Sequence, residues 1–172
     1  KLQVVQERRL LAEAGHISFA ELVPVIEKLT EESSYLVVSG VKAVLSGLKI
    51  FVEEGSETEE AYNDLVIKLS RFNFDRLGFE AKDGESDEDE LVRQIVIGNL
   101  IAANDEKATQ EADGIFKAHQ DDLEKLPAAI RLNILINQIK HHESKELTDQ
   151  YLKHYVSTVD GSFKRQLASA LA

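Results

Sequence analysis

The residues best suited to chemistry in this chain lie at positions 141–146, where the sequence reads HHESKE. The zinc-binding motif H-E-x-x-H places two imidazoles four residues apart on one helix face, and its glutamate activates a metal-bound water. With His142 as the first histidine, the second would stand at position 146, where the chain has Glu146. One ligand of the motif is therefore missing, and we interpret the segment as the solvated start of a helix.

No other motif supplies a catalytic, metal or cofactor site. The acidic run at residues 83–90 matches no register of a calcium-binding EF-hand loop, and its acids are better explained by the favourable charge that they place at the start of a helix. The chain has no Cys, which excludes disulfides and thiol chemistry, and His16, His119 and His154 stand singly. We therefore predict no catalytic residue, no metal and no cofactor in this chain.

Arg93 and Arg131 are the candidate site residues, because each interrupts an otherwise apolar stretch of helix. Arginine is rarely buried without a partner. One interpretation is an internal ion pair with one of the 31 acidic residues. The other is a guanidinium on a concave surface, where its planar fork could hold the carboxylate of a peptide. The sequence leaves both interpretations open.

Apolar residues recur at helical spacing along the whole chain, and no alternating strand pattern competes with them. The clearest predicted helix faces are Val37, Val41, Val44, Leu48 and Phe51; Ala61, Leu65, Leu69 and Phe72; Leu132, Ile136 and Ile139; and Phe163, Leu167 and Ala170. The fold is therefore predicted to be all-α. Helix pairs recur at roughly 35–45 residues, the scale of HEAT-like repeats. We favour an irregular α-α superhelix of such pairs over a compact bundle.

Composition narrows the class of partner and location. The 172 residues carry a net charge of −11 and show no basic stripe with interleaved aromatic residues, so a nucleic acid would be repelled. No apolar run approaches the roughly 18 residues of a membrane span. The start of the chain does not resemble a signal peptide. We therefore expect a cytoplasmic protein that binds neither nucleic acid nor membrane.

A series of short motifs runs in order along nearly the whole chain. Residues 11–18 are similar to LA-x-x-G-x-IS, residues 30–39 to K-N-E-x-x-Y-x-x-W-S with Val38 in place of Trp, and residues 78–93 to GW-x-x-x-x-x-E-x-x-x-x-x-L-x-R with Phe79 in place of Trp. Residues 104–116 are similar to GD-x-x-x-x-x-x-A-x-x-x-F, residues 126–131 to IPP-x-LR, and residues 169–172 to SALA. Together these segments resemble the C-terminal helical domain of M1-family aminopeptidases of the aminopeptidase N type.

The resemblance implies a non-catalytic part of a zinc-dependent enzyme that removes N-terminal residues from peptides. In that family the zinc ligands and the GAMEN substrate-recognition segment lie upstream, in a thermolysin-like domain, and neither occurs in this chain. The helical domain caps the catalytic domain and encloses the peptide chamber. The implied partners are the catalytic domain of the same polypeptide and peptide substrates. The alternative is a HEAT-like scaffold that binds another protein through its concave face, with no enzyme attached.

The two ends of the chain carry a further expectation. The sequence starts at Lys1, contains no Met and stops at Ala172, where the family continues with more helices. We therefore expect residues 1–172 to be a single helical domain that is an internal fragment of the C-terminal domain of a larger aminopeptidase. Its terminal helices would then expose apolar stripes, and the candidates at the C-terminal end are Phe163, Leu167 and Leu171.

Overall fold

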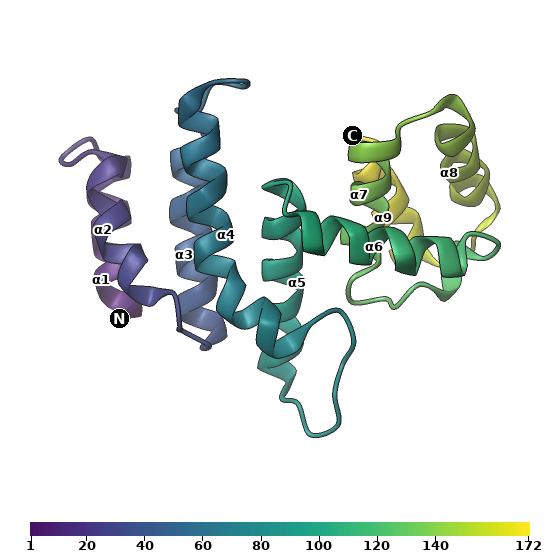
Figure 1. Ribbon diagram of the computed structural model, residues 1–172, viewed down its shortest axis with the longest axis horizontal. Coiled ribbons are helices and arrows are strands. Elements are labelled where there is room, and N and C mark those ends of the chain that lie inside the picture. The colour runs from purple at the N-terminus through teal and green to yellow at the C-terminus, as the bar shows by residue number, and fades with distance from the viewer. The chain divides into compact units, whose positions relative to one another are not determined.

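The computed structural model describes all 172 residues, and its regular structure is entirely helical (Figure 1). The all-α prediction is therefore confirmed. The helices gather into two compact units, Lys1–Asn104 and Asp105–Ala172. Neighbouring helices pack in pairs, with α4 against α5 in the first unit and α6 against α7 in the second, which is consistent with the predicted helix pairs.

The first unit is built from five α-helices and two short 3₁₀ turns. In order these are α1 (Leu2–Glu13), η1 (Phe19–Leu22), α2 (Val23–Ile26), η2 (Glu27–Leu29), α3 (Tyr35–Lys49), α4 (Glu57–Leu77) and α5 (Asp87–Ala102). Its core joins α1, α2 and α3 through Val5, Ile26 and Val44, all nearly inaccessible to solvent. A second part of the core forms where α4 meets α5, with Phe74 and Phe79 in an edge-to-face contact at 5.8 Å.

The second unit contains α6 (Glu106–His119), η3 (Leu123–Lys125), α7 (Arg131–His142), α8 (Lys145–Ser157) and α9 (Gly161–Ala170). Tyr151 of α8 is fully buried, and its hydroxyl donates a hydrogen bond of 3.1 Å to the carbonyl of Leu135. Phe163 and Leu167 of α9 are also fully buried, since α9 packs against α7 and α8. The expectation that Phe163 and Leu167 form an exposed stripe is therefore wrong.

Helix starts follow the capping chemistry of the sequence. Ser18 and Glu21 exchange side-chain and backbone hydrogen bonds at the start of η1, and Ser86 and Asp89 do the same at the start of α5. The acidic run is thus the first turn of α5, where four carboxylates oppose the positive end of the helix dipole. Gly78 ends α4 with a φ of 59°, a conformation that suits residues without a side chain.

Two of the predicted buried helix faces include a residue that the structure exposes. Phe51 lies beyond the end of α3 and is 69% exposed, and Phe72 is 39% exposed on the outer side of α4. The buried face of α4 includes Asn73 instead, whose amide donates a 2.7 Å hydrogen bond to the carbonyl of Glu32. A polar residue with a backbone partner can occupy a core position, and a search for apolar periodicity passes over it.

Candidate functional site

Arg93 is a buried residue in the second turn of α5, and its side chain is only 2% exposed. Its guanidinium forms an ion pair with Glu85, and its Nε donates a hydrogen bond of 3.2 Å to the carbonyl of Gly78. The hydrogen bond from Arg93 holds the pKa of the Glu85 carboxyl below its ordinary value. Arg93 therefore fastens the loop between α4 and α5 to the start of α5.

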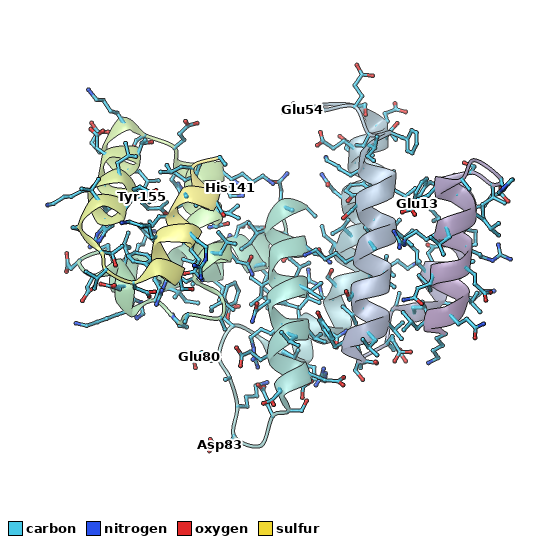
Figure 2. The ribbon with its side chains drawn as sticks, turned by 180° about the vertical axis from the view of Figure 1, so that it is seen from behind. Glu13, Glu54, Glu80, Asp83, His141 and Tyr155 are labelled. Atoms are coloured by element: carbon cyan, nitrogen blue, oxygen red, sulfur yellow. The ribbon has the colours of Figure 1, made fainter.

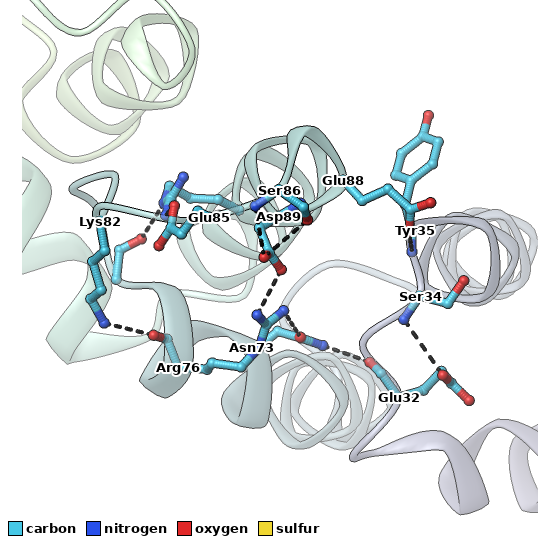
Figure 3. Close-up of polar contacts among 12 residues, drawn as sticks. Glu32, Ser34, Tyr35, Asn73, Arg76, Lys82, Glu85, Ser86, Glu88 and Asp89 are labelled. Atoms are coloured by element: carbon cyan, nitrogen blue, oxygen red, sulfur yellow. Dashed lines mark hydrogen bonds and ion pairs between the residues drawn. The ribbon is translucent and has the colours of Figure 1, made fainter.

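A polar network surrounds this loop and extends along the first unit (Figure 3). Arg76 of α4 forms an ion pair of 2.6 Å with Asp89 and donates a hydrogen bond of 3.1 Å to the side chain of Asn73. Asn73 in turn reaches the backbone of Glu32, before α3. Arg76 and Asn73 of α4 thus connect this helix to α5 and to the segment before α3.

Arg131 is the first residue of α7 and is 6% exposed. Its Nη2 donates hydrogen bonds to the carbonyls of Glu124 at 2.7 Å and Leu126 at 3.0 Å, and its Nε also reaches Leu126 at 3.2 Å. Its Nη1 lies 3.3 Å from an acceptor oxygen of Gln166 and 3.7 Å from a carboxylate oxygen of Asp160. Each guanidinium nitrogen therefore has an acceptor inside the second unit.

The guanidinium of Arg131 also contacts an aromatic ring of the second unit. Its guanidinium carbon lies 5.0 Å from the centre of the buried Phe163 ring, within the range of a cation–π contact. The geometry accordingly supports an internal role for both arginines, with backbone carbonyls as the principal acceptors of Arg131. Contact with a peptide carboxylate by either residue stays a prediction.

The segment 141–146 contains the end of one helix and the exposed start of the next, so the predicted solvated helix start lies at Ser144 and Lys145, later than His142. His142 is the last residue of α7, Glu143 caps this helix, and α8 begins at Lys145 after the N-cap residue Ser144. The neighbouring His141 is labelled in Figure 2. Burial, followed by the nearby charge of Lys140, lowers the pKa of His141. Because His142 and Glu146 lie on different helices, they do not share the single face that the motif requires.

A polar cluster around Asp113 of α6 is the feature that sequence reasoning missed. One carboxylate oxygen accepts hydrogen bonds from Asn137 at 2.8 Å and Gln138 at 2.6 Å, and the other lies 2.8 Å from Nε2 of His142. Asn137 and Gln138 therefore occupy the buried face of α7, which the sequence assigned to Leu132, Ile136 and Ile139. The sequence feature that could have indicated this cluster is the polar pair Asn137 and Gln138 inside an apolar helix, together with Asp113 on the preceding helix.

The donor set of this chain does not fit a zinc ion. No group of three or more His, Asp or Glu side chains is arranged to hold a metal. His142 pairs with Asp113, and the other polar groups that contact Asp113 are the side-chain amides of Asn137 and Gln138. None of the helices combines the length and apolar character needed to cross a membrane.

Comparison with known proteins shows which family shares the series of motifs in this chain. The family model described as ERAP1-like C-terminal domain matches residues 1–172, which is the entire chain. The chain belongs to the ERAP1-like C-terminal domain family. The aminopeptidase N of Lactococcus lactis subsp. lactis is 46% identical to it over 173 aligned residues that cover all of the chain. That of Lactobacillus helveticus is 39% identical over 99% of the chain.

The chain matches only a small part of each relative's length. The chain covers 20% of the length of each of these two bacterial relatives, at their C-terminal end. A plant relative, aminopeptidase M1-D of rice, is 25% identical over 71% of the chain and 14% of its own length. As a member of the ERAP1-like C-terminal domain family, the chain thus corresponds to the non-catalytic C-terminal part of aminopeptidases, as its motifs predict.

Proposed function

We propose that this chain works as the helical cap of a longer aminopeptidase N that removes N-terminal residues from peptides. The observation that carries the proposal is the alignment of the whole chain, at 46% identity, with only 20% of the length of a lactococcal aminopeptidase N. The partner would be a catalytic domain in the same polypeptide, which would hold the zinc ion and supply the water that attacks the peptide bond. The residues of this chain would enclose the peptide and exclude bulk water.

The proposal includes a cytoplasmic location and no binding to nucleic acid or membrane. The net charge of −11 supports the exclusion of nucleic acid, because a phosphate backbone would be repelled. Fractionation of cells that express the tagged full-length polypeptide tests the location, and recovery in the membrane pellet would count against it.

Contact between a peptide carboxylate and Arg93 or Arg131 is a separate hypothesis within this function. Both guanidiniums have internal acceptors, so a contact would require some of these hydrogen bonds to be released or shared. A charge-assisted hydrogen bond to a carboxylate could compensate for such a loss.

The decisive experiment begins with the gene. Its upstream coding sequence should contain H-E-x-x-H followed by a more distant Glu, and the full-length protein should hold one zinc ion and hydrolyse aminoacyl anilides. A stop codon placed just before the codon of Lys1 should then reduce turnover of peptides. A gene that encodes no such motif would refute the proposal and favour a scaffold without an enzyme.

A further inference from the structure

A groove of about 860 Å³ opens in the first unit between the segment from α1 to α2 and the ends of α3 and α4 that face it. One wall is formed by Phe19 and Val23, and the other by Leu48, Val52, Ala61 and Leu65. This volume falls within the range of about 300–1,000 Å³ that is typical of ligand pockets lined mostly by apolar side chains.

Aromatic residues keep this groove apolar up to its edge. The ring of Phe19 lies against Gly47 so closely that a Cβ added there would stand 2.2 Å from the ring. Phe51 lies 6.0 Å from Phe19, centre to centre, and remains 69% exposed, and the adjacent Ile50 is 80% exposed. Large apolar side chains thus stand open to solvent beside a groove that has space for more of them.

The groove is bordered by unbalanced negative charge. Residues 50–67 contain no Lys, Arg or His, and their acids are Glu53, Glu54, Glu57, Glu59, Glu60 and Asp64. Figure 2 labels Glu54 in the turn between α3 and α4, and Glu13 at the end of α1, which is paired with Arg9.

Only part of this negative charge is matched within the unit. Glu59 pairs with Lys49, and Glu27 pairs with Lys68 at 2.9 Å, so the two lysines that flank residues 50–67 are already engaged. Glu57 and Glu60 are exposed and precede Asp64 on α4 by seven and four residues, which is two helical turns and one. Asp64 itself lines the groove.

We propose that this groove binds a basic amphipathic helix of a separate polypeptide. The apolar face of that helix would enter between Phe19 and Leu65, and its lysines or arginines would lie against Glu57, Glu60 and Asp64. A helix in an apolar groove is a common mode of peptide recognition, and complementary charge fixes its orientation and its partner. The proposal goes beyond the function proposed above and does not rest on it.

The test measures binding of three synthetic helical peptides of about four turns to the 172-residue chain, by fluorescence anisotropy at physiological salt. The first peptide has a leucine face and lysines elsewhere. The second keeps the leucines and replaces every lysine by glutamate, and the third keeps the lysines and replaces every leucine by serine. We expect saturable binding of the first peptide only.

Two charge variants locate the binding. Asp64→Lys should weaken binding of the leucine–lysine peptide by about tenfold, because an attraction at the groove becomes a repulsion. Glu111→Lys changes an exposed acid of α6, in the second unit, by the same amount of charge and should leave the affinity unchanged. Ala61→Gln adds bulk without charge at an exposed position of the groove and should also weaken binding. This second variant tests the groove independently if Asp64→Lys disturbs the fold.

The opposite results would overturn the proposal. Equal weakening by Asp64→Lys and Glu111→Lys would mean diffuse attraction to an acidic protein. Equal binding of the leucine–glutamate peptide would mean an apolar site with no preference for a basic partner. Binding of the lysine–serine peptide as tight as that of the leucine–lysine peptide, or no binding of the leucine–lysine peptide, would mean that the groove takes up no apolar helix face.

Discussion

Buried arginines in this chain act as cross-links between backbone segments. Arg131 reaches two carbonyls of the segment that precedes its own helix, and Arg93 reaches the carbonyl of Gly78 at the end of α4. A planar fork with five donors suits this purpose better than an ammonium group, because it can hold several acceptors at fixed angles. The pattern L-x-R and the segment LPAAIR in the sequence thus mark places where a loop is tied to a helix start.

Replacement of Arg131 by alanine should therefore destabilise the fold strongly. The change leaves the carbonyls of Glu124 and Leu126 without their donor and removes the cation from the face of Phe163, at a cost of about 3 kcal/mol. Thermal denaturation of the variant measures the cost. Arg131→Lys should recover only part of it, since one ammonium group cannot reach all the acceptors.

The same Arg131→Ala variant tests the peptide contact in the full-length protein. An internal role predicts the same change in KM for short peptides and for single-residue anilides. A contact with the peptide carboxylate predicts a rise in KM for short peptides alone. A selective rise of this kind with an unchanged melting temperature would contradict the internal role.

Acid should weaken the first unit through Asp89. The hydrogen bond from Arg76 is the largest of the effects that lower the pKa of Asp89 below its ordinary value of 3.8. The unfolded chain therefore takes up a proton here more readily than the folded chain, so the stabilisation is complete well above the ordinary pKa and is lost as the pH falls through the lowered one. We expect stability to decline as the pH falls below about 5 and through the lowered pKa of Asp89.

Asp89→Asn isolates this contribution, because the amide oxygen can still accept the hydrogen bond from the backbone of Ser86 at the helix start. Urea denaturation at several pH values should give a shallower dependence on pH for Asp89→Asn than for the unchanged chain. Identical slopes would show that the ion pair with Arg76 does not contribute to stability.

At the scale of the helix, the sequence predicts starts better than faces. Serine followed three residues later by an acid is a local pattern, so the caps at Ser18 and Ser86 could be read directly. The face of α7 could not, because the buried Asn137 and Gln138 depend on Asp113, which lies on another helix. Apolar periodicity identifies a helix and then assigns its buried side incorrectly wherever polar residues find such partners.

The contact between η1 and α3 gives a prediction at this scale. Glycine in the middle of a helix ordinarily costs about 1 kcal/mol relative to alanine. At Gly47, however, the added methyl group would meet three atoms of the Phe19 ring at 2.2–2.9 Å and displace it. Gly47→Ala should therefore lower the melting temperature.

Gly114→Ala is the matched control for Gly47→Ala. Gly114 lies in the middle of α6 with no heavy atom within 4 Å of an added Cβ, so its replacement should raise the melting temperature. A rise for both variants would show that Phe19 moves aside at no cost.

At the scale of the whole molecule, the sequence could establish fold class and family but not the environment of the last helix. The motifs follow the chain in order, and the family match covers the same residues 1–172. The error concerned Phe163 and Leu167, which were expected to be exposed because they lie near the end of the chain. Position in the sequence does not determine burial, since α9 folds back between α7 and α8, which precede it.

The 172-residue chain by itself should bind no zinc stoichiometrically and hydrolyse no aminoacyl substrate. Zinc in a peptidase needs three protein ligands around one open position, and the closest candidate here offers one imidazole and one carboxylate, with amides at the remaining contacts of Asp113. Elemental analysis of protein purified without a metal-affinity tag, together with a chromogenic aminopeptidase assay, measures both properties. His142→Ala should leave both at background, because His142 braces α7 against α6 and has no catalytic part in this prediction. One equivalent of zinc with turnover that disappears in His142→Ala would place a catalytic centre in this chain and refute its role as a cap.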